Sequence, residues 1–298
     1  MRLTGLHLLL TYQCTFECDH CFVWGSPFQS GTMTLADTEY ILEQAGQIPS
    51  LTSIYFEGGE PFLYYPLLVK GVQRAASMGF QVGIVSNAYW ANSVADALAW
   101  LQPFQGLIDD LSVSSDLYHY NETISHQVQN AQTAAQQLGL PLGVISVAQP
   151  ESNDAARQTG QLSLGESGIM YRGRAVEVLA PRAAKQPWHR FTTCPYEDLR
   201  EPGRLHLDPI GHLHICQGIS IGNVYAQPLA EICAAYDPDT HPVAGPLLRG
   251  GPLALIEAYN LPHEDQYAGA CHLCYRARTA LRPRLPDILA PDQIYGKF

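Results

Sequence analysis

Short apolar runs alternate with segments of helical periodicity throughout the first half of this chain. Five of these runs are predicted as strands: residues 6–11, 53–56, 81–85, 111–113 and 141–147. Four helices are predicted between them: residues 34–47, 66–78, 92–101 and 121–138. Strands that alternate with helices form parallel βαβ units, because two parallel strands need a long crossover connection. The first half therefore predicts an α/β fold with a parallel sheet.

A sixth strand is expected near residues 169–172 or 176–179. Five or six βα units in about 180 residues predict a partial (β/α)6 barrel rather than a closed eightfold one. The sequence then becomes rich in Pro, Gly, His and Cys, with little helical periodicity until its end. We therefore place a boundary near Lys185, which divides the chain into a barrel (residues 1–185) and a small α+β domain (residues 186–298).

The composition excludes several classes of protein. The chain has 298 residues, a formal net charge of -11 and only 17 Lys and Arg, so it lacks the basic stripe of a nucleic-acid-binding protein. No apolar run approaches the roughly 18 residues of a membrane span. Residues 1–10 are apolar, but they lack the positive charges and the cleavage site of a signal peptide. We expect a cytoplasmic protein with no nucleic-acid or membrane partner.

The cysteines fall into an N-terminal triplet and a C-terminal group, with none between: Cys14, Cys18 and Cys21, then Cys194, Cys216, Cys233, Cys271 and Cys274. A disulfide scaffold is typical of a small secreted chain, and this chain is neither small nor visibly secreted. Grouped cysteines in a reducing compartment are more often metal ligands. Both groups are therefore candidate metal sites.

Cys14, Cys18 and Cys21 form a C-x3-C-x2-C run directly after the first predicted strand. Three thiolates this close in sequence can ligate three irons of a four-iron cluster and leave the fourth iron open to a ligand. The loop also leaves its strand at the carboxyl end, where the catalytic groups of α/β barrels gather. The alternatives are three unrelated buried cysteines or a zinc site, which favours paired C-x2-C units with a fourth ligand.

This spacing resembles that of the radical S-adenosylmethionine (SAM) superfamily. The resemblance implies a radical SAM barrel in which the open iron of a [4Fe–4S] cluster chelates SAM. One electron from the cluster then cleaves SAM to methionine and a 5'-deoxyadenosyl radical, which abstracts a hydrogen atom from the substrate. The resemblance also implies that His20, the residue before the third cysteine, lies by the adenine.

Turns made of glycine and polar residues follow the second, third and fourth predicted strands. Glycines let the backbone approach a ligand closely, and small polar side chains can bind a ribose or a carboxylate, although both also form ordinary turns and caps. In this order these turns resemble the SAM contacts of the superfamily, with Glu60 and nearby carbonyls accepting from the ammonium group of the cofactor. The candidate residues are Gly58, Gly59, Glu60 and Pro61, then Ser86 and Asn87, then Ser114 and Asp116.

Four C-terminal cysteines can close the coordination of a second metal centre. A Pro-x-Gly turn at residues 209–211 indicates a β-hairpin that carries Cys216 on its second strand. This half resembles the auxiliary-cluster extensions called SPASM and twitch, and Gly173-Arg174-Ala175 before it fits them too. Its five cysteines match one twitch-type [4Fe–4S] cluster better than the two clusters of a full SPASM extension. The implied ligands are Cys194, Cys216, Cys271 and Cys274, and a structural zinc on the same four thiolates remains the alternative.

Cys233 is expected in a short helix over residues 229–236. Buried free cysteines are common and inert, which is the simplest interpretation. A thiol that faced the active site would instead return a hydrogen atom to a substrate radical or ligate the auxiliary cluster.

The resemblance implies an enzyme that modifies a peptide by crosslinking, epimerisation or oxidation. The alternative is a dehydrogenase of a small alcohol or sugar in cofactor or antibiotic biosynthesis. A third hypothesis is a non-catalytic iron–sulfur or zinc scaffold, which the intact triplet and the Gly-Gly-Glu-Pro turn disfavour. We expect two [4Fe–4S] clusters and SAM as cofactors. Besides the peptide or small-molecule substrate, we expect an external one-electron donor such as flavodoxin or ferredoxin as a partner.

Overall fold

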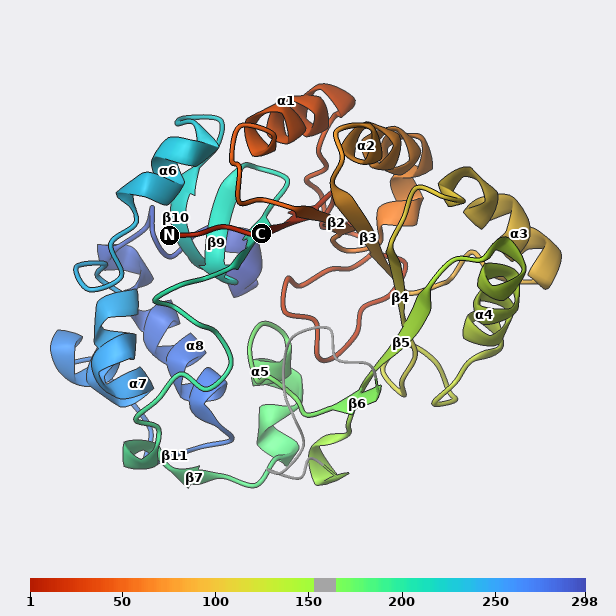
Figure 1. Ribbon diagram of the computed structural model, residues 1–298. Coiled ribbons are helices and arrows are strands. Elements are labelled where there is room, and N and C mark those ends of the chain that lie inside the picture. The colour runs from red at the N-terminus through yellow and green to blue at the C-terminus, as the bar shows by residue number, and fades with distance from the viewer. Residues whose placement is uncertain (153–164) are drawn as a thin grey trace.

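Most of the strands form one curved sheet at the centre of the molecule (Figure 1). The computed structural model describes residues 1–152 and 165–298. The sheet has nine strands in the order β10-β9-β8-β1-β2-β3-β4-β5-β6. Its first six strands along the chain run parallel: β1 Gly5–Leu9, β2 Ser53–Glu57, β3 Gln81–Ser86, β4 Asp110–Ser114, β5 Leu142–Val147 and β6 Gly165–Ser167. The predicted α/β fold with a partial barrel is therefore confirmed.

Helices connect the strands and cover the outer face of the sheet (Figure 1). They are α1 Leu35–Ala45, α2 Tyr65–Ser77, α3 Val94–Leu101 and α4 His126–Leu138. Thr34 caps α1: its hydroxyl accepts from Asp37 N at 3.1 Å, and the Asp37 carboxylate accepts from Thr34 N at 2.7 Å. The start predicted for α4 is wrong, because the Ser125 hydroxyl caps this helix by accepting from Val128 N and leaves Ile124 exposed before it.

The sixth strand lies before both of the positions predicted for it. β6 ends at Ser167, whose carbonyl accepts a hydrogen bond from Ala148 N at 2.9 Å, just beyond the end of β5. The second predicted position is instead part of a short helix, α5 (Ala175–Val178), which follows Gly173 in a left-handed conformation with φ +59°. A short apolar run cannot be assigned to strand or helix from its periodicity alone. Here the left-handed turn at Gly173 leads directly into a helix.

The chain beyond the barrel continues the same sheet. β8 (Arg204–Leu207) pairs with β1 in parallel, and β9 (His212–Cys216) and β10 (Ile219–Asn223) follow as antiparallel strands. The predicted hairpin is confirmed, because Gly211, with φ +92°, lies in the turn between β8 and β9, and Cys216 ends the second strand. The boundary predicted between the two parts of the chain stays a prediction.

Further helices and a small second sheet complete the described structure. The helices are α6 Leu229–Ala235, α7 Ala244–Tyr259 and α8 Ala270–Leu281, and β7 (Gln186–Pro187) pairs with β11 (Gln266–Tyr267). Short 3₁₀ helices span Pro61–Tyr64, Gln102–Phe104, Pro150–Ser152, Ala180–Arg182, Trp188–Arg190, Arg282–Arg284 and Asp292–Tyr295. The sequence pattern does not predict α7, because Gly250-Gly251-Pro252 interrupts its periodicity, and the helix bends there. No helix within the described residues is long and apolar enough to cross a membrane.

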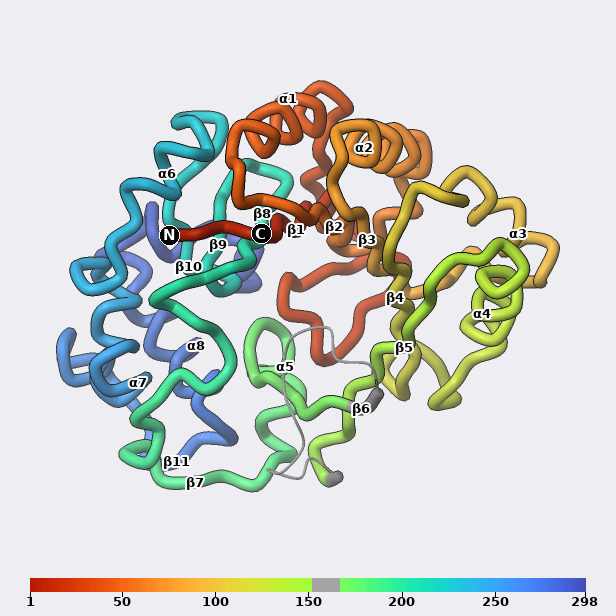
Figure 2. Tube along the Cα trace, viewed as in Figure 1, coloured from red at the N-terminus to blue at the C-terminus, as the bar shows by residue number. Residues whose placement is uncertain are grey.

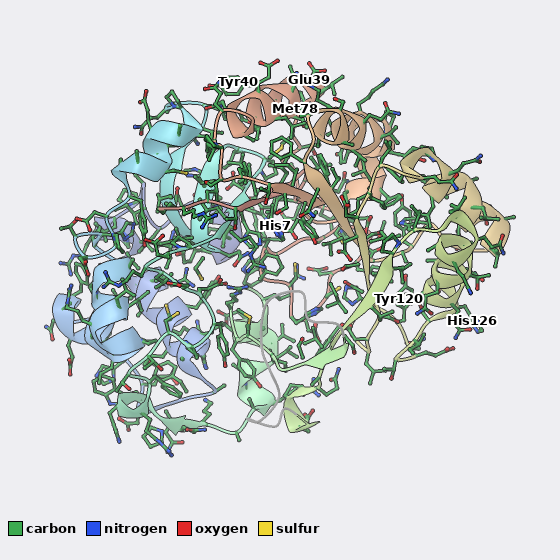
Figure 3. All side chains as sticks on the ribbon, in the orientation of Figure 1. His7, Glu39, Tyr40, Met78, Tyr120 and His126 are labelled. Carbon is green, nitrogen blue, oxygen red and sulfur yellow. The ribbon has the colours of Figure 1, made fainter. Side chains whose placement is uncertain are left out.

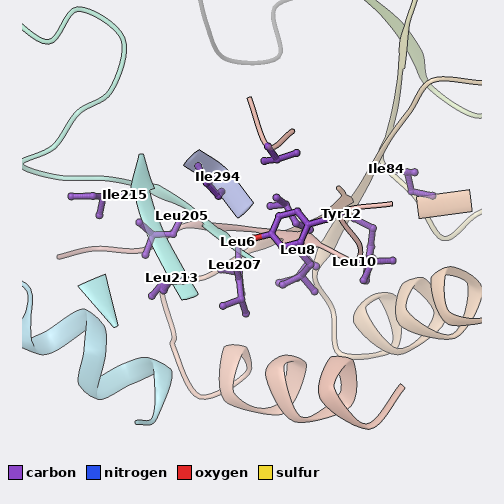
Figure 4. Close-up of a cluster of buried hydrophobic side chains, with 14 of the residues drawn as sticks. Leu6, Leu8, Leu10, Tyr12, Ile84, Leu205, Leu207, Leu213, Ile215 and Ile294 are labelled. Carbon is purple, nitrogen blue, oxygen red and sulfur yellow. The ribbon is translucent and has the colours of Figure 1, made fainter. Parts of the chain in front are cut away.

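Alternation along the strands separates the apolar core from the interior of the barrel. Leucines of β1, β8 and β9 gather on one side, in the core shown in Figure 4: Leu6, Leu8, Leu205, Leu207 and Leu213. Successive side chains of a strand face opposite sides, so the residues between these leucines point the other way. His7 and His206, which are partners in the β1–β8 register, therefore face the interior of the barrel.

Candidate active site

A cavity of about 250 Å³ opens at the carboxyl ends of the parallel strands. Its wall includes the last residue of five neighbouring strands: Glu57, Ser86, Ser114, Val147 and Ser167. The loop after β1 lies inside the arc of strands in Figure 2 and contributes Cys14, Cys18 and Cys21 to the same wall. The structure thus brings the three cysteines of the N-terminal run to one cavity at the catalytic end of the barrel.

N–H groups donate to two sulfurs of this cysteine loop, those of Cys14 and Cys21. Gly25 N donates to Cys21 Sγ at 3.1 Å, and Phe16 N and Asn87 Nδ2 each donate to Cys14 Sγ at 3.5 Å. Such donors stabilise a thiolate. Burial raises the pKa of Cys14 to about 12, so this thiol keeps its proton until a metal centre displaces it. The three sulfurs and their donors fit an iron–sulfur cluster held by three protein ligands.

Within the described residues, no three cysteine sulfurs gather as closely as a single zinc ion requires. A tetrahedral zinc ion with Zn–S bonds near 2.3 Å needs sulfurs about 3.8 Å apart. Across residues 1–152 and 165–298, only two groups of three ligand side chains have all their ligand atoms within 4.8 Å of one another, and neither contains a cysteine. An iron–sulfur cube holds its protein ligands further apart than a zinc ion does, so both cysteine groups remain compatible with a cluster.

Arg174 holds the cysteine loop in place. Its guanidinium donates to the carbonyls of Cys18 and Gly25 at 2.7 and 2.8 Å, and its backbone N–H donates to the carbonyl of Cys21 at 3.0 Å. Gly173 permits this approach, because a Cβ there would lie 2.5 Å from the Cys21 carbonyl oxygen. The resemblance to auxiliary-cluster extensions assigns Gly173 and Arg174 to the C-terminal half of the chain. Their contacts instead support the first cysteine group.

The glycine turn after β2 packs against the chain that leads into the cysteine loop. Gly59 N donates to Thr11 O at 2.6 Å, and Glu60 N donates to Gln13 O at 2.9 Å. A Cβ on Gly59 would lie 2.1 Å from the Gln13 carbonyl oxygen, which is closer than any side chain can come. Gly58 and Gly59 also line the cavity, so this turn both supports the cysteine loop and forms part of the wall.

Glu60 lies behind the cavity wall, although the resemblance placed its carboxylate on the cofactor. The side chain is fully buried and accepts hydrogen bonds from Phe62 N at 3.1 Å, Ser86 Oγ at 2.9 Å and Asn87 N at 2.8 Å. Pro61 is buried beside it and does not line the cavity either. The carboxylate is occupied in joining the end of β2 to the end of β3, so it positions the wall rather than facing a ligand.

Replacing Glu60 with glutamine should remove a pH dependence of stability. Burial raises the pKa of Glu60 to about 7 in the folded chain, from an ordinary value of 4.5, so the folded state binds this proton more tightly than the unfolded state does. The free energy of unfolding should therefore fall between about pH 5 and pH 8, by up to about 3 kcal/mol from this group. Urea titrations should show a larger fall for wild-type protein than for Glu60→Gln, and equal falls would contradict the account.

Four other predicted cofactor contacts line the cavity: His20, Ser86, Asn87 and Ser114. Burial lowers the pKa of His20 to about 4, so its ring is neutral. Asp116 lies behind the wall instead, where it hydrogen-bonds with His119 Nδ1 at 2.8 Å and accepts from Val147 N at 3.2 Å. Asp116 thus joins β4 to β5 much as Glu60 joins β2 to β3.

The four C-terminal cysteines predicted as auxiliary ligands also line one cavity: Cys194, Cys216, Cys271 and Cys274. Cys216 ends β9, whereas Cys271 and Cys274 lie near the start of α8 rather than in a turn. The half-buried Arg172 and the buried Arg278 lie with them. Arg172 Nη1 is 3.5 Å from Cys216 Sγ, and Arg278 is 1% exposed. Their positive charges offset the charge that thiolates would bring into a buried site.

Cys233 lies apart from both cavities. It is buried in α6, which packs beside α1 on the outer side of the sheet (Figure 1). Burial raises the pKa of this thiol to about 11, so it is protonated at neutral pH. The placement favours the inert interpretation over a hydrogen donor or a cluster ligand.

The fold and the first cysteine group define an α/β-barrel protein with a three-cysteine metal site at the carboxyl ends of its strands. Residues 8–116, which hold that cysteine group, match the family described as the Radical SAM superfamily. This part of the chain, which includes the cysteine loop and β2 to β4, is therefore similar to the Radical SAM superfamily.

Two curated proteins are similar to parts of the chain. "Putative peptide biosynthesis protein YydG" of Bacillus subtilis (strain 168) is 25% identical over 202 residues, which cover 65% of this chain and 62% of that protein. "Tungsten-containing aldehyde ferredoxin oxidoreductase cofactor-modifying protein" of Pyrococcus furiosus is 34% identical over 83 residues, which cover 28% of this chain and 23% of that protein. The chain therefore spans less than two thirds of the length of these relatives.

A solved structure shares the fold over nearly the whole chain. It is that of native anSMEcpe with bound AdoMet and Cp18Cys peptide, and the match covers 96% of this chain and 98% of that one. The TM-score is 0.51 and the sequences are 12% identical, so the likeness concerns the fold alone.

Proposed function

We propose that this chain is a radical SAM enzyme that modifies a peptide. The observation that carries the proposal is the cavity in which Cys14, Cys18 and Cys21 meet the carboxyl ends of the parallel strands. The Bacillus subtilis relative is named as a putative peptide biosynthesis protein, and anSMEcpe has been solved with AdoMet and a peptide together. Crosslinking, epimerisation and oxidation of an amino-acid residue can all begin with the removal of one hydrogen atom.

The cluster supplies the electron that cleaves SAM, and the chain holds and orients the reactants. The three cysteines of the loop ligate three irons, and the backbone beside Gly59 offers carbonyls to the ammonium group of SAM. Asn87 and Ser114 present polar side chains to the ribose and carboxylate from the ends of β3 and β4. The neutral ring of His20 packs on the adenine. Each of these residues except the cysteines acts by binding, not by chemistry.

The C-terminal cavity supports a second [4Fe–4S] cluster on Cys194, Cys216, Cys271 and Cys274. These thiols line one site, and no three of their sulfurs all lie within 4.8 Å of one another. Arg172 lines both cavities, so the two cavities are neighbours, which supports a second centre near the first. A cluster placed there can accept the electron of a substrate radical, which favours oxidation or crosslinking over epimerisation.

Replacing the four C-terminal cysteines with alanine should halve the iron content. After anaerobic reconstitution, wild-type protein should hold about eight irons and eight sulfides per chain, and the variant about four of each. The variant should still release 5'-deoxyadenosine, because its first cysteine group is intact. Cys233→Ala is the matched control and should keep all of the iron. Zinc in place of iron at the second site of wild-type protein would overturn the second cluster.

The peptide substrate is tested with short peptides encoded beside the gene of this chain. Reconstituted enzyme, SAM and a reductant should change such a peptide. Loss of two hydrogens indicates a crosslink or an oxidation. Epimerisation instead leaves the mass of the peptide unchanged in ordinary water and adds one deuterium in heavy water. Turnover of a small alcohol or sugar, with every peptide unchanged, would replace the peptide proposal by the dehydrogenase. SAM that stays intact in the fully reconstituted protein would favour the scaffold.

A further inference from the structure

Two histidines and a glutamate meet on the inner face of the barrel. His7 Nδ1 lies 3.1 Å from Glu57 Oε2, and His206 Nε2 lies 3.2 Å from Glu57 Oε1. One ligand atom from each of the three residues lies within 4.8 Å of the other two. None of the three residues belongs to the cysteine loop or to the turns assigned above to SAM, so the proposed function leaves this group without a role.

The parallel register of the sheet explains why these residues meet. β1 lies between β2 and β8, so His7 is paired with Tyr55 on one side and with His206 on the other. Glu57 is two residues beyond Tyr55 and therefore lies on the same face of β2. His7, Glu57 and His206 are 3%, 7% and 8% exposed, and all three line the cavity that contains the cysteine loop.

Hydrogen bonding leaves part of this group unsatisfied. His7 Nδ1 and Glu57 Oε2 form a hydrogen bond, whereas within the described residues Glu57 Oε1 accepts no hydrogen bond of good geometry and has His206 Nε2 at 3.2 Å. A buried carboxylate oxygen without a partner is costly in free energy. A cation between the three side chains would remove this cost, since it accepts lone pairs from both histidines and from the carboxylate.

The distances also suit a metal ion. Ligands about 2.1 Å from a tetrahedral or octahedral ion are about 3.0 to 3.4 Å apart when they are neighbours. The two measured separations, 3.1 and 3.2 Å, fall within that range. Two arginines, Arg172 and Arg204, line the same cavity. Both lie near the Glu197 carboxylate, Arg172 at 3.1 Å and Arg204 at 3.7 Å. The arginines of this wall are thus paired, which leaves the charge of Glu57 available to an ion.

We propose that His7, Glu57 and His206 bind one divalent transition-metal ion of the zinc or ferrous-iron class. Two histidines and one carboxylate suit such ions and leave coordination positions open. The open positions face the cavity, where a carboxylate, amide or hydroxyl oxygen of the substrate can bind the ion. The His206 ring lies 6.4 Å from that of Phe22, the residue after Cys21, so a substrate held by this ion lies beside the cysteine loop.

Cobalt(II) is the ion for the test, because it enters zinc and ferrous sites. It is paramagnetic, whereas oxidised [4Fe–4S] clusters are diamagnetic, so its EPR signal can be told apart from the clusters. The full chain is first reconstituted with its clusters, so that its cysteines are occupied, and is then titrated with Co²⁺. Wild-type protein should bind one further Co²⁺ per chain, with a high-spin EPR signal. Glu57→Gln and His206→Asn should each lose this Co²⁺ and its signal while keeping the iron content of wild-type protein.

His126→Asn is the matched control. His126 is exposed on α4, whereas His7 lies within the barrel (Figure 3), so this variant should bind Co²⁺ as wild-type protein does. The two ligand variants remove different groups, so a fold defect in one of them, seen as lost iron, leaves the other as the test. Wild-type protein that takes up no Co²⁺ beyond its clusters, or an iron-replete ligand variant that takes up as much as wild-type protein, would overturn the proposal.

Discussion

An Arg174→Ala variant is expected to keep only about half of the iron of wild-type protein after anaerobic reconstitution, because the first cysteine loop loses its support. The guanidinium holds the carbonyls of Cys18 and Gly25 with hydrogen bonds of 2.7 and 2.8 Å inside the protein. Bonds of this charged kind are worth about 1.5 to 3 kcal/mol each. Lysine cannot span both carbonyls, so Arg174→Lys should fail as well.

Arg182→Ala is the control for the loss of one arginine. Arg182 forms an exposed ion pair with Glu151, and its removal should change neither the iron content nor the stability by a measurable amount. Iron and sulfide analysis of Arg174→Ala, Arg174→Lys and Arg182→Ala makes the comparison. Full iron in Arg174→Ala would show that the loop keeps its shape without the guanidinium.

A Gly59→Ala variant should also lose the first cluster. The new Cβ would meet the Gln13 carbonyl oxygen at 2.1 Å and the Tyr12 carbonyl oxygen at 2.8 Å. Both are backbone atoms just before Cys14, so the loop itself must move to relieve the collision. The variant should bind about half of the wild-type iron and release no 5'-deoxyadenosine from SAM.

Gly106→Ala separates the collision from the general cost of replacing a glycine. Gly106 has φ +74°, and a Cβ there meets nothing within 4 Å, so the change costs about 1 to 2 kcal/mol of backbone strain and nothing more. This variant should keep its iron and its SAM cleavage. If Gly59→Ala behaved like Gly106→Ala, the turn after β2 would not support the cysteine loop.

Much of the barrel follows from its sequence because local patterns determine it. The strands β1 to β5 each contain a short apolar run, and signals such as Thr34 before α1 mark where helices begin. The errors occur where a local pattern is ambiguous. The helical pattern predicted for residues 121–138 begins before Ser125, the residue that caps α4. Gly250-Gly251-Pro252 hides α7, because it interrupts an otherwise helical segment.

The site is predictable only where its residues are close in sequence. The spacing of Cys14, Cys18 and Cys21 is visible directly. The role of Arg174 is not, because it contacts the loop across more than 150 intervening residues. The family resemblance implies that Glu60 faces the ligand, whereas its three buried donors appear only in three dimensions. His7 offered a signal, as a polar residue inside an apolar strand, but its partners could not be named without the strand order.

Everything in this account depends on one loop of three thiols binding the iron–sulfur cube at which SAM is cut. The most direct measurement compares wild-type protein with the variant in which Cys14, Cys18 and Cys21 are all alanine, both reconstituted anaerobically and reduced with dithionite. Wild-type protein should release 5'-deoxyadenosine from SAM, and the variant should release none above the protein-free level while it keeps the absorbance of the C-terminal cluster. Release by the variant at the wild-type rate would contradict the central claim.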